Sequence, residues 1–424
     1  MKTIRLGFLG CGNIGSGVAR LLAEQAETLE RREGYRFEIR KALVRDPAKP
    51  RRADLPRGIF TTRPDEVTDD PEIDVVLEFL GGTEPAAGLI IKALSNGKAV
   101  VTANKMALAA RWEEIFRAAR AGKTGLFFEA AVGGAIPVIR ALTDSLQANR
   151  ITGVTGIING TTNYILSRMS AEGMSYADAL AEAQRLGLAE PDPSADVEGF
   201  DSAYKLSILT SLAFRKHIPP EAVYREGISG VTPIDIACGR EMGLVLKLLA
   251  VGREGESGVE ARVHPAFVPA SHPLAGVNGS FNAVFVRGHA CGEMMFYGRG
   301  AGDSPTASAI VSDLLHAAQG EVHLPAGEGG RTIPLDDWQS EYFIRLRAKD
   351  QPGVLSMASG KLAEEGVSIA SMVQKGARDA SGFVQLVILT HRARERAVRA
   401  ALAALDPDMV KGVVVIRVEG TEIL

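Results

Sequence analysis

Apolar and polar positions in the first third of the chain follow two repeating patterns. Short apolar runs that predict buried strands occur at residues 4–9, 37–44, 73–80, 99–102 and 126–129. Segments with the apolar spacing of a helix lie between them, at residues 84–94 and 111–121. Strands that alternate with helices in this way are typical of an α/β domain built on a parallel sheet.

A glycine-rich turn joins the first strand to an amphipathic helix. Gly10, Gly12 and Gly15, with Asn13 and Ile14 between them, have the spacing that permits a tight turn and lets a pyrophosphate approach the helix N-terminus. The pattern is weak by itself, but here it follows a strand and opens a helix. We therefore predict a Rossmann-type dinucleotide site rather than a chance glycine turn.

The end of the second strand bears on the choice of coenzyme. NAD enzymes usually place an acid there, whereas this chain has Val44, Arg45 and Asp46. Arg45 suits the 2′-phosphate of NADP, while Asp46 can still bind the ribose hydroxyls of NAD. The sequence favours NADP, with NAD as the alternative.

Two lysines are candidates for the chemistry. Lys105 follows a strand end, and open parallel sheets bind ligands at that edge, although a solvated lysine at a helix start is the alternative. Lys205 lies on the apolar stripe of a helix that starts near Asp201. Asp201 precedes Lys205 by one helical turn, so the two side chains are predicted to share a pocket. A solvated ion pair on the helix surface is the competing interpretation.

The segment before that helix is rich in carboxylates. Pro191 and Pro193 interrupt it, so we expect a loop rather than a helix. Its acids are Glu190, Asp192, Asp196 and Glu198. Several carboxylates that converge on a loop can hold a substrate ammonium group.

Two further turns contain small and polar residues. Residues 129–137 combine Glu129 with two glycines, so backbone carbonyls and one carboxylate can turn towards a hard cation, although a plain glycine hinge fits equally well. Residues 159–164 place amides and hydroxyls, including Thr161, between two apolar runs. They can face a polar ligand or simply cap the next helix.

The pattern changes after a polar linker at residues 327–339. Strands are expected at residues 342–348, 367–373, 383–389 and 413–418, with helices ending near residue 365 and spanning residues 394–405. This order is β-α-β-β-α-β. The chain also has a second glycine loop, which includes Gly302 and precedes a helix.

Composition excludes several other classes of protein. The 424 residues are 46% hydrophobic and 23% charged, with a formal net charge of -3, so we expect no nucleic-acid or membrane partner. No apolar segment is long enough for a membrane span. Three scattered cysteines and no recognisable signal segment lead us to expect a cytoplasmic protein.

These motifs together resemble those of homoserine dehydrogenases over nearly the whole chain. The resemblance rests on residues 10–15, 101–105, 129–137, 159–164, 190–205 and 298–308. It implies NAD(P)-dependent interconversion of L-homoserine and L-aspartate 4-semialdehyde, in threonine, methionine and isoleucine synthesis, by a homodimer or homotetramer. The coenzyme motif and the two lysines also fit this reaction by themselves, because reduction of an aldehyde needs a hydride and an acid such as a lysine ammonium.

The resemblance also implies roles for particular residues. Lys205 and Lys105 are the catalytic candidates, and we favour Lys205 for proton transfer and Lys105 for positioning. Glu190, Asp196, Asp201, Thr161 and Lys105 are the substrate-binding candidates. Coenzyme binding is assigned to Gly10, Gly12, Asn13, Ile14, Gly15, Arg45, Lys105 and Gly302. A sodium ion is expected at Glu129 and at the carbonyls of Val132, Gly134 and Ile136.

The C-terminal pattern resembles an ACT domain, a small module that commonly binds amino acids. Its Asp350, Gly353 and Val354 form the turn expected to bind an effector, for which L-threonine is the candidate. A mere dimerisation module is the alternative. The expected architecture is therefore a Rossmann domain at residues 1–136, completed by 298–326, an α+β catalytic and dimerisation domain at 137–297, the linker at 327–339, and a βαββαβ ACT domain at 340–424.

Two other functions share features with this sequence. A non-catalytic protein that senses nucleotides and amino acids would need the same domains, but the retained lysines and acids argue against it. Aspartate-semialdehyde dehydrogenase needs a nucleophilic cysteine. Cys11 lies in the predicted phosphate turn, and neither Cys238 nor Cys291 has a suitable motif.

Overall fold

The computed structural model describes residues 1–322 and 328–420, and these form two compact units. The first unit contains Met1–Ile158, Asp201–Val223 and Phe281–Gly330, and the second contains Asn159–Phe200, Tyr224–Ser280 and the chain from Arg331 onwards. Within the described residues, no helix is long and apolar enough to cross a membrane.

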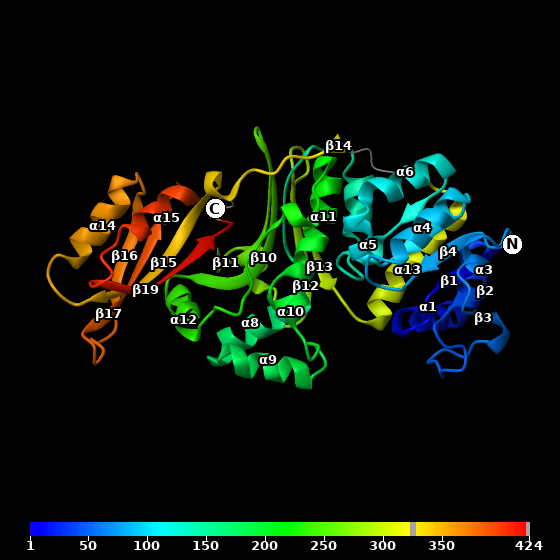
Figure 1. Cartoon of the computed structure of the whole chain (residues 1–424), viewed down its shortest axis with the longest axis horizontal. Helices are drawn as coiled ribbons and strands as arrows, with labels where there is room; N and C mark the ends of the chain where they lie inside the picture. The colour runs from blue at the N-terminus through cyan, green and yellow to red at the C-terminus, as the bar shows by residue number, and fades with distance from the viewer. Residues whose placement is uncertain (323–327, 421–424) are drawn as a thin grey trace. The chain divides into compact units, whose positions relative to one another are not determined.

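A parallel six-stranded sheet forms the centre of the N-terminal part of the first unit (Figure 1). Its strand order is β3-β2-β1-β4-β5-β6. The strands are β1 (Lys2–Leu9), β2 (Tyr35–Leu43), β3 (Phe60–Thr61), β4 (Val75–Glu78), β5 (Ala99–Thr102) and β6 (Leu126–Phe127). The order reverses between β1 and β4, and ligands of open α/β sheets bind at such a point.

Helices pack against this sheet because each buries an apolar stripe. The main ones are α1 (Asn13–Glu24), α4 (Ala86–Ser95), α5 (Lys105–Ala110), α6 (Trp112–Gly122) and α13 (Asp303–Gln319). Helix α13, far away in sequence, lies beside α1 (Figure 1), and its Ala307, Ile310 and Leu314 share one apolar core with Val18 and Leu22. Shorter helical turns here are α2 (Ala26–Thr28), η1 (Leu29–Glu33), η2 (Arg57–Ile59) and α3 (Asp65–Thr68).

The rest of the first unit includes an antiparallel set of strands and the long helix α11 (Phe200–Phe214). The strands pair in the order β13-β12-β7. Their bounds are β7 (Ile151–Ile157), β12 (Phe281–Gly288) and β13 (Gly292–Arg299). Other elements are η3 (Glu129–Ala131), α7 (Val138–Arg140), η4 (Ala141–Ser145), β8 (Lys216–His217), η5 (Pro220–Ala222) and β14 (Glu328–Gly329).

The second unit is built on a sheet that joins a long hairpin to the C-terminal module. Strands β10 (Leu244–Gly255) and β11 (Gly258–Pro269) form the hairpin, and β11 pairs in parallel with β19 (Val410–Val418). The other elements before the module are α8 (Gly160–Glu172), α9 (Tyr176–Arg185), α10 (Ser194–Val197), β9 (Tyr224–Arg225), α12 (Pro233–Glu241) and η6 (Pro273–Gly276).

The C-terminal module has the predicted order of strands and helices. Its sheet order is β19-β15-β17-β16, and buried residues of α14 and α15 share one core with that sheet. The elements are η7 (Leu335–Asp337), β15 (Gln339–Lys349), α14 (Val354–Glu364), β16 (Ile369–Lys375), β17 (Phe383–Thr390), β18 (Ala393–Arg394), α15 (Glu395–Ala403) and β19. The predicted fold class is confirmed.

Some local predictions were wrong. The strand expected at residues 126–129 ends at Phe127, because Glu129 begins the helical turn η3. The acidic loop contains the short helix α10, with Pro193 at its N-cap, a place where a missing N–H is tolerated. The predicted domain boundaries stay a prediction. The junction between residues 326 and 327 and the last four residues of the predicted ACT domain lie outside the described residues.

Candidate active site

The dinucleotide turn has the geometry that its sequence predicts. Gly10 has φ of +105°, and a Cβ on Gly15 would lie 3.0 Å from the Gly10 carbonyl oxygen, so side chains are excluded at both positions. A Cβ on Gly12 would meet nothing within 4 Å. Gly12 is the N-cap of α1 and Asn13 its exposed first residue, so the helix start faces open space that a diphosphate can fill.

The other predicted coenzyme residues lie around the same domain. Arg45 is exposed just beyond β2, and Ile14 is half-buried in the first turn of α1. Gly302, with φ of +119°, is the N-cap of α13. The following residue, Asp303, has its carbonyl oxygen 3.5 Å from a Cβ placed on Gly17 of α1. The starts of the two helices therefore lie close together.

Three predicted site residues meet around one carboxylate in the first unit. Asp201 and Lys205 pair on α11, as their spacing predicts, with 2.7 Å between Asp201 Oδ2 and Lys205 Nζ. Asp201 Oδ1 lies 3.1 Å from Nζ of Lys105, at the start of α5. Lys205 Nζ also donates to the carbonyl oxygen of Ile158 at 2.7 Å. The exposed side-chain fraction is 11% for Lys205 and 34% for Lys105, so Lys205 is the more enclosed lysine.

Asp196 and Thr161 lie in the second unit, where each has a protein partner. Asp196 Oδ1 accepts a hydrogen bond from Asn159 Nδ2 at 2.7 Å. Asn159 in turn caps α8, because its Oδ1 accepts from the Thr162 amide at 2.9 Å. Thr161 Oγ1 donates its proton to the Leu188 carbonyl oxygen at 2.7 Å. Its hydroxyl is therefore already used as a donor.

Glu190 and its neighbours make fewer interactions with the fold. The Glu190 side chain is exposed, while its carbonyl oxygen accepts a hydrogen bond from Gln184 Nε2 at 3.1 Å. Glu198 Oε1 accepts from Ser229 Oγ at 2.9 Å, and Asp192 Oδ1 accepts from the Ser194 amide at 3.1 Å. Asp192 and Glu198 therefore each have a different hydrogen-bond partner.

The proposed cation loop has a buried carboxylate at its start. Glu129 is 4% exposed, and its two oxygens accept hydrogen bonds from the amides of Ile139 and Arg140, both at 2.8 Å. Burial raises the pKa of Glu129 to about 7, although these amides oppose the shift. The Glu129 amide donates to the buried Asp313, whose pKa is raised well above its usual value by burial and by Glu129.

The other expected cation ligands in that loop are the backbone carbonyl oxygens of Val132, Gly134 and Ile136. Gly134 has φ of +57°, and a Cβ there would lie 2.7 Å from the Gly300 carbonyl, so only glycine fits. The Ile136 carbonyl oxygen accepts from the Val138 amide at 2.8 Å, which leaves one lone pair for a cation. Val132 is fully buried. A carboxylate and backbone carbonyl oxygens are ligand types that hard cations accept.

Sequence reasoning missed the buried acids Glu78 and Asp313. Each is a single carboxyl group within an apolar segment, and it has at least one hydrogen-bond partner from a distant part of the chain. Among residues 1–322 and 328–420, no group of three or more His, Cys, Asp or Glu side chains is arranged to hold a metal ion.

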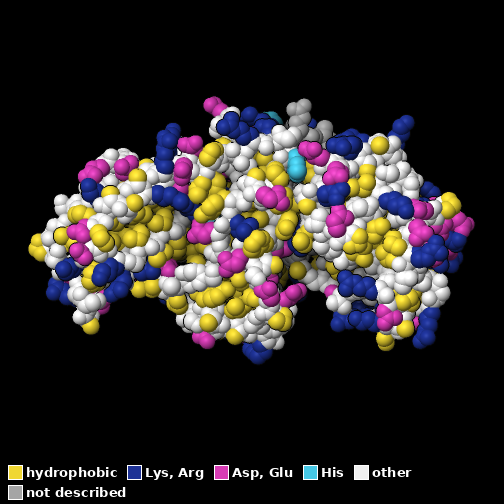
Figure 2. Space-filling view, viewed as in Figure 1, with side chains coloured by type: hydrophobic (Ala, Val, Ile, Leu, Met, Phe, Trp, Pro, Cys, Tyr) yellow, Lys and Arg dark blue, Asp and Glu magenta, His cyan; other side chains and the backbone are white. Residues whose placement is uncertain are grey.

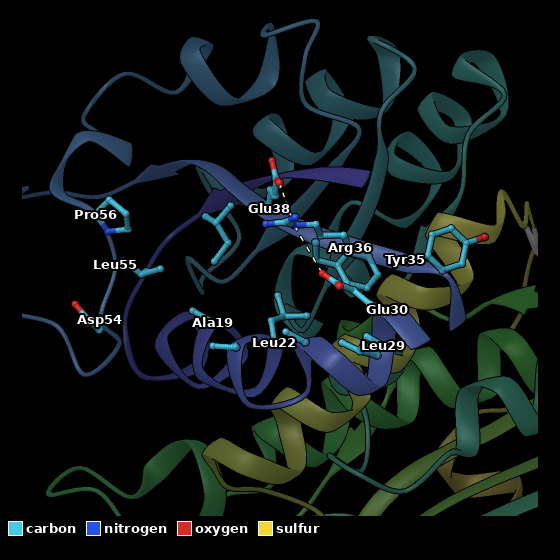
Figure 3. Close-up of a pocket in the computed structure, with 14 residues that line it drawn as sticks. Ala19, Leu22, Leu29, Glu30, Tyr35, Arg36, Glu38, Asp54, Leu55 and Pro56 are labelled. Carbon is cyan, nitrogen blue, oxygen red and sulfur yellow. Dashed lines mark ion pairs between the residues drawn. The ribbon is translucent and has the colours of Figure 1, made fainter. Parts of the chain in front are cut away.

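A cavity elsewhere in the first unit does not contain the predicted site. Figure 3 shows it between α1 and β2, with Leu22 and Leu29 on one side and Tyr35 on the other. Arg36 forms ion pairs there with Glu30 at 3.7 Å and Glu38 at 3.3 Å. None of the predicted site residues lines this cavity. On the face drawn in Figure 2, basic and acidic side chains are interspersed.

The predicted effector turn is formed at the start of α14. Gly353 has φ of +92° and is the N-cap, and Val354 is the first residue of the helix. Asp350 Oδ2 accepts hydrogen bonds from Arg378 Nη2 at 2.8 Å and Nε at 3.0 Å. The Arg378 hydrogen bond is the main reason that the pKa of Asp350 is lowered.

Comparisons with known proteins give the same assignment across the chain. The homoserine dehydrogenase family model matches residues 137–315, the model for the homoserine dehydrogenase NAD binding domain matches residues 10–129, and the ACT domain model matches residues 342–407. The homoserine dehydrogenase of Mycobacterium tuberculosis is 44% identical, over 99% of this chain and 98% of its own. That of Pseudomonas aeruginosa is 42% identical, over 99% of both chains.

Solved structures agree. A homoserine dehydrogenase from Thiobacillus denitrificans matches with a TM-score of 0.91 and 42% identity, over 99% of both chains. A hyperthermophilic archaeal homoserine dehydrogenase in complex with NADPH matches with a TM-score of 0.65 and 26% identity, over 76% of this chain and all of its own.

Fold and site together define an oxidoreductase with a Rossmann domain for a nicotinamide coenzyme. In the first unit, Lys105 and Lys205 both pair with the partly buried carboxylate of Asp201. The chain belongs to the homoserine dehydrogenase family and carries a C-terminal ACT domain.

Proposed function

We propose that the protein interconverts L-homoserine and L-aspartate 4-semialdehyde with NAD(P), and so acts in threonine, methionine and isoleucine synthesis. The observation that carries the proposal is the pairing of Lys105 and Lys205 with Asp201, in the same unit as the dinucleotide turn. The bound nicotinamide supplies the hydride chemistry. The lysines and carboxylates of the chain then have to bind substrate and move one proton.

Lys205 is the residue we assign to proton transfer. An ammonium group has three protons, and Lys205 donates two of them, to Asp201 and to the Ile158 carbonyl oxygen. The third is available to protonate the alkoxide that forms as the aldehyde is reduced. In the reverse direction the neutral amine accepts the hydroxyl proton of homoserine. These two fixed hydrogen bonds keep the nitrogen in one place.

Lys105 is the residue we assign to positioning. It is more exposed than Lys205, and it holds the other oxygen of Asp201. Two cations then face one anion, so the cluster has an excess positive charge. That charge favours the α-carboxylate of the substrate and the oxygen that becomes negative during reduction.

The remaining charged group of the substrate is its α-ammonium, for which carboxylates are the natural partners. We assign the α-ammonium group to Glu190, Asp196 and Asp201. Asp196 uses one oxygen for Asn159, which leaves the other for substrate. Because the Thr161 hydroxyl donates to Leu188, we assign its contribution to the α-carboxylate to the backbone amide at the start of α8.

We propose NADP as the preferred coenzyme, with NAD as the alternative. Arg45 is exposed at the end of β2, beside the edge where the ribose of a dinucleotide binds. An arginine recognises a phosphate with several fixed donors. Removal of this side chain in Arg45→Ala should lower kcat/KM for NADP and leave the value for NAD nearly unchanged.

A sodium ion is proposed to bind at Glu129 and the carbonyl oxygens of Val132, Gly134 and Ile136. The support is a buried carboxylate whose hydrogen bonds come from neutral amides. A cation there would offset its negative charge and brace the loop, without taking part in hydride transfer. We also propose that the protein is a homodimer or homotetramer, that it is cytoplasmic, and that the predicted domain boundaries hold.

The ACT domain is proposed to bind L-threonine and to inhibit the enzyme. The start of α14, at Gly353 and Val354, offers backbone amides for an α-carboxylate, and Asp350 offers an oxygen for an α-ammonium. Inhibition requires that threonine bind one conformation of the enzyme better than another.

The test is homoserine oxidation with NADP and NAD side by side, followed through the absorbance of the reduced coenzyme. We expect turnover with both and a higher kcat/KM for NADP. Folded protein that reduces neither coenzyme at saturating homoserine would overturn the proposed function. A control without homoserine, and one with L-2-aminobutyrate, which has the same carbon chain without the hydroxyl group, would show that the reaction depends on the alcohol.

A further inference from the structure

Glu78 is a buried acid at the carboxyl end of β4, where the strand order reverses. It is 0% exposed and lies between Leu9 of β1 and Thr102 of β5 in the sheet. Burial raises the pKa of its carboxyl group, and four hydrogen bonds to that group oppose the shift. A carboxyl group buried at this cost, in a sheet of apolar strands, calls for a reason beyond packing.

Its hydrogen bonds lead to two turns at the same edge of the sheet. Oε2 accepts from Thr102 Oγ1 at 2.6 Å. Oε1 accepts from the Leu80 amide at 2.7 Å and from Asn104 Nδ2 at 3.4 Å. One carboxylate therefore ties the turn after β4 to the turn after β5.

The second of those turns places Lys105. The Asn104 amide donates to Thr102 Oγ1 at 2.9 Å, so the threonine hydroxyl connects Glu78 to the Asn104 backbone. Asn104 also caps α5 by accepting from the Ala107 amide at 3.1 Å, and it donates to the Gly82 carbonyl oxygen at 2.8 Å. Lys105, the next residue, then reaches Asp201.

We propose that Glu78, acting through Thr102 and Asn104, is a positioning residue that fixes the start of α5 so that Lys105 meets Asp201. The proposal rests on the proposed function for its kinetic readout. Glu78 itself lies beneath the turns and has no direct contact with Lys105 among the hydrogen bonds of the described residues. Its effect on the reaction is therefore indirect.

The chain offers a matched set of variants. Thr102→Val removes the hydroxyl that links Glu78 to Asn104, and Thr102→Ser keeps it. Thr68→Val is the control, because Thr68 is equally buried in the same domain and its hydroxyl donates to Pro64 and Asp69 instead. Glu78→Gln tests the carboxylate directly and keeps its shape.

Two readouts are needed. The first is homoserine oxidation, for which Thr102→Val and Glu78→Gln should lower kcat about tenfold, as expected for a lost hydrogen bond to a charged group, with a much smaller change in coenzyme KM. Thr102→Ser and Thr68→Val should keep kcat within about twofold of the wild type. The second is acetylation of Lys105 by acetic anhydride, measured by peptide mass spectrometry, which should become several-fold faster only in the first two variants.

Each result decides something. Unchanged kcat and unchanged Lys105 acetylation in Thr102→Val would overturn the positioning role. A loss of kcat in Thr68→Val as large as that in Thr102→Val would overturn it too. Should Glu78→Gln fail to fold, the Thr102 pair still decides the question. A wild-type protein that does not oxidise homoserine would overturn the proposed function alone, since the acetylation rates judge the placement of Lys105 without turnover.

Discussion

The Asp201 cluster and the Asp350 turn are each proposed to bind an amino acid through a carboxylate, and they differ in burial and in charge. Asp201 is 11% exposed and faces two lysines. Asp350 is 34% exposed and faces one arginine, Arg378, which is 59% exposed. An exposed ion pair contributes about 0 to 1 kcal/mol, so a ligand can displace it, whereas an enclosed cluster keeps its geometry. Catalysis needs the fixed arrangement, and regulation needs the exchangeable one.

The largest expected effect comes from Lys205. Lys205→Ala should lower kcat by about 10² to 10⁴-fold, because a positioned acid or base contributes that much. The coenzyme affinity of this variant, measured by quenching of protein fluorescence, should equal that of the wild-type protein. Lys105→Ala is the comparison, with a smaller loss of kcat and a larger rise in homoserine KM. The reverse ranking of the two variants would show that our division of roles is wrong.

The second effect concerns the ion cluster around Glu419, directly after β19. Glu419 of the C-terminal segment accepts hydrogen bonds from Arg253 at 2.7 Å and from the fully buried Arg262 at 2.8 Å. Glu419→Gln should lower the free energy of unfolding by about 3 kcal/mol, since it removes a buried carboxylate that pairs with Arg253 and with the fully buried Arg262. Glu364→Gln, which breaks an exposed pair with Lys361, is the control and should change it by less than about 0.5 kcal/mol.

This cluster also changes how the ACT domain should be studied. Removal of the domain would remove Glu419, the partner of Arg262. It would also remove Arg345, whose Nε lies 2.6 Å from Oδ1 of the buried Asp235. A truncated enzyme would lose stability for reasons unrelated to threonine. Point changes in the exposed turn are therefore the cleaner test of regulation.

The third effect is on inhibition. Asp350→Asn should weaken threonine inhibition by about 5 to 150-fold, the range of a typical coupling energy, and leave turnover without threonine unchanged. Arg378→Ala should strengthen inhibition, because the ammonium group of threonine would no longer compete with the arginine. Inhibition curves of the two variants that match the wild type would show that this turn is not the effector site.

The smallest effect is expected from sodium. Binding at the Glu129 loop should raise the free energy of unfolding by about 0.4 kcal/mol when the ion concentration equals Kd, and more above it. Thermal unfolding in sodium chloride and in choline chloride at equal ionic strength measures this. Glu129→Gln should abolish the difference, and a wild-type protein with no difference would argue against the site.

Local sequence patterns predicted the parts of the site that lie within one or two turns of chain. The glycine turn follows from the spacing of its own glycines, and the Asp201–Lys205 pair follows from the period of one helix. The order of the strands and helices followed from the alternation of apolar runs. These features depend on backbone geometry that each segment fixes for itself.

The parts that escaped prediction depend on packing between distant segments. Lys105 reaches Asp201, and Glu129 meets Asp313, only after the chain has folded. Glu78 has no local pattern that separates it from the apolar residues around it. A single acid in an apolar run is nevertheless a signal, because burial without partners would be too costly.

The most direct test of the central claim is to follow hydrogen from the substrate carbinol carbon. Homoserine with deuterium at C4 should give reduced NADP that carries one deuterium per turnover in the wild-type protein, together with aspartate 4-semialdehyde. Lys205→Ala should form this labelled coenzyme far more slowly, although it binds NADP. Reduced coenzyme without deuterium, or no reduced coenzyme from folded wild-type protein, would contradict the account.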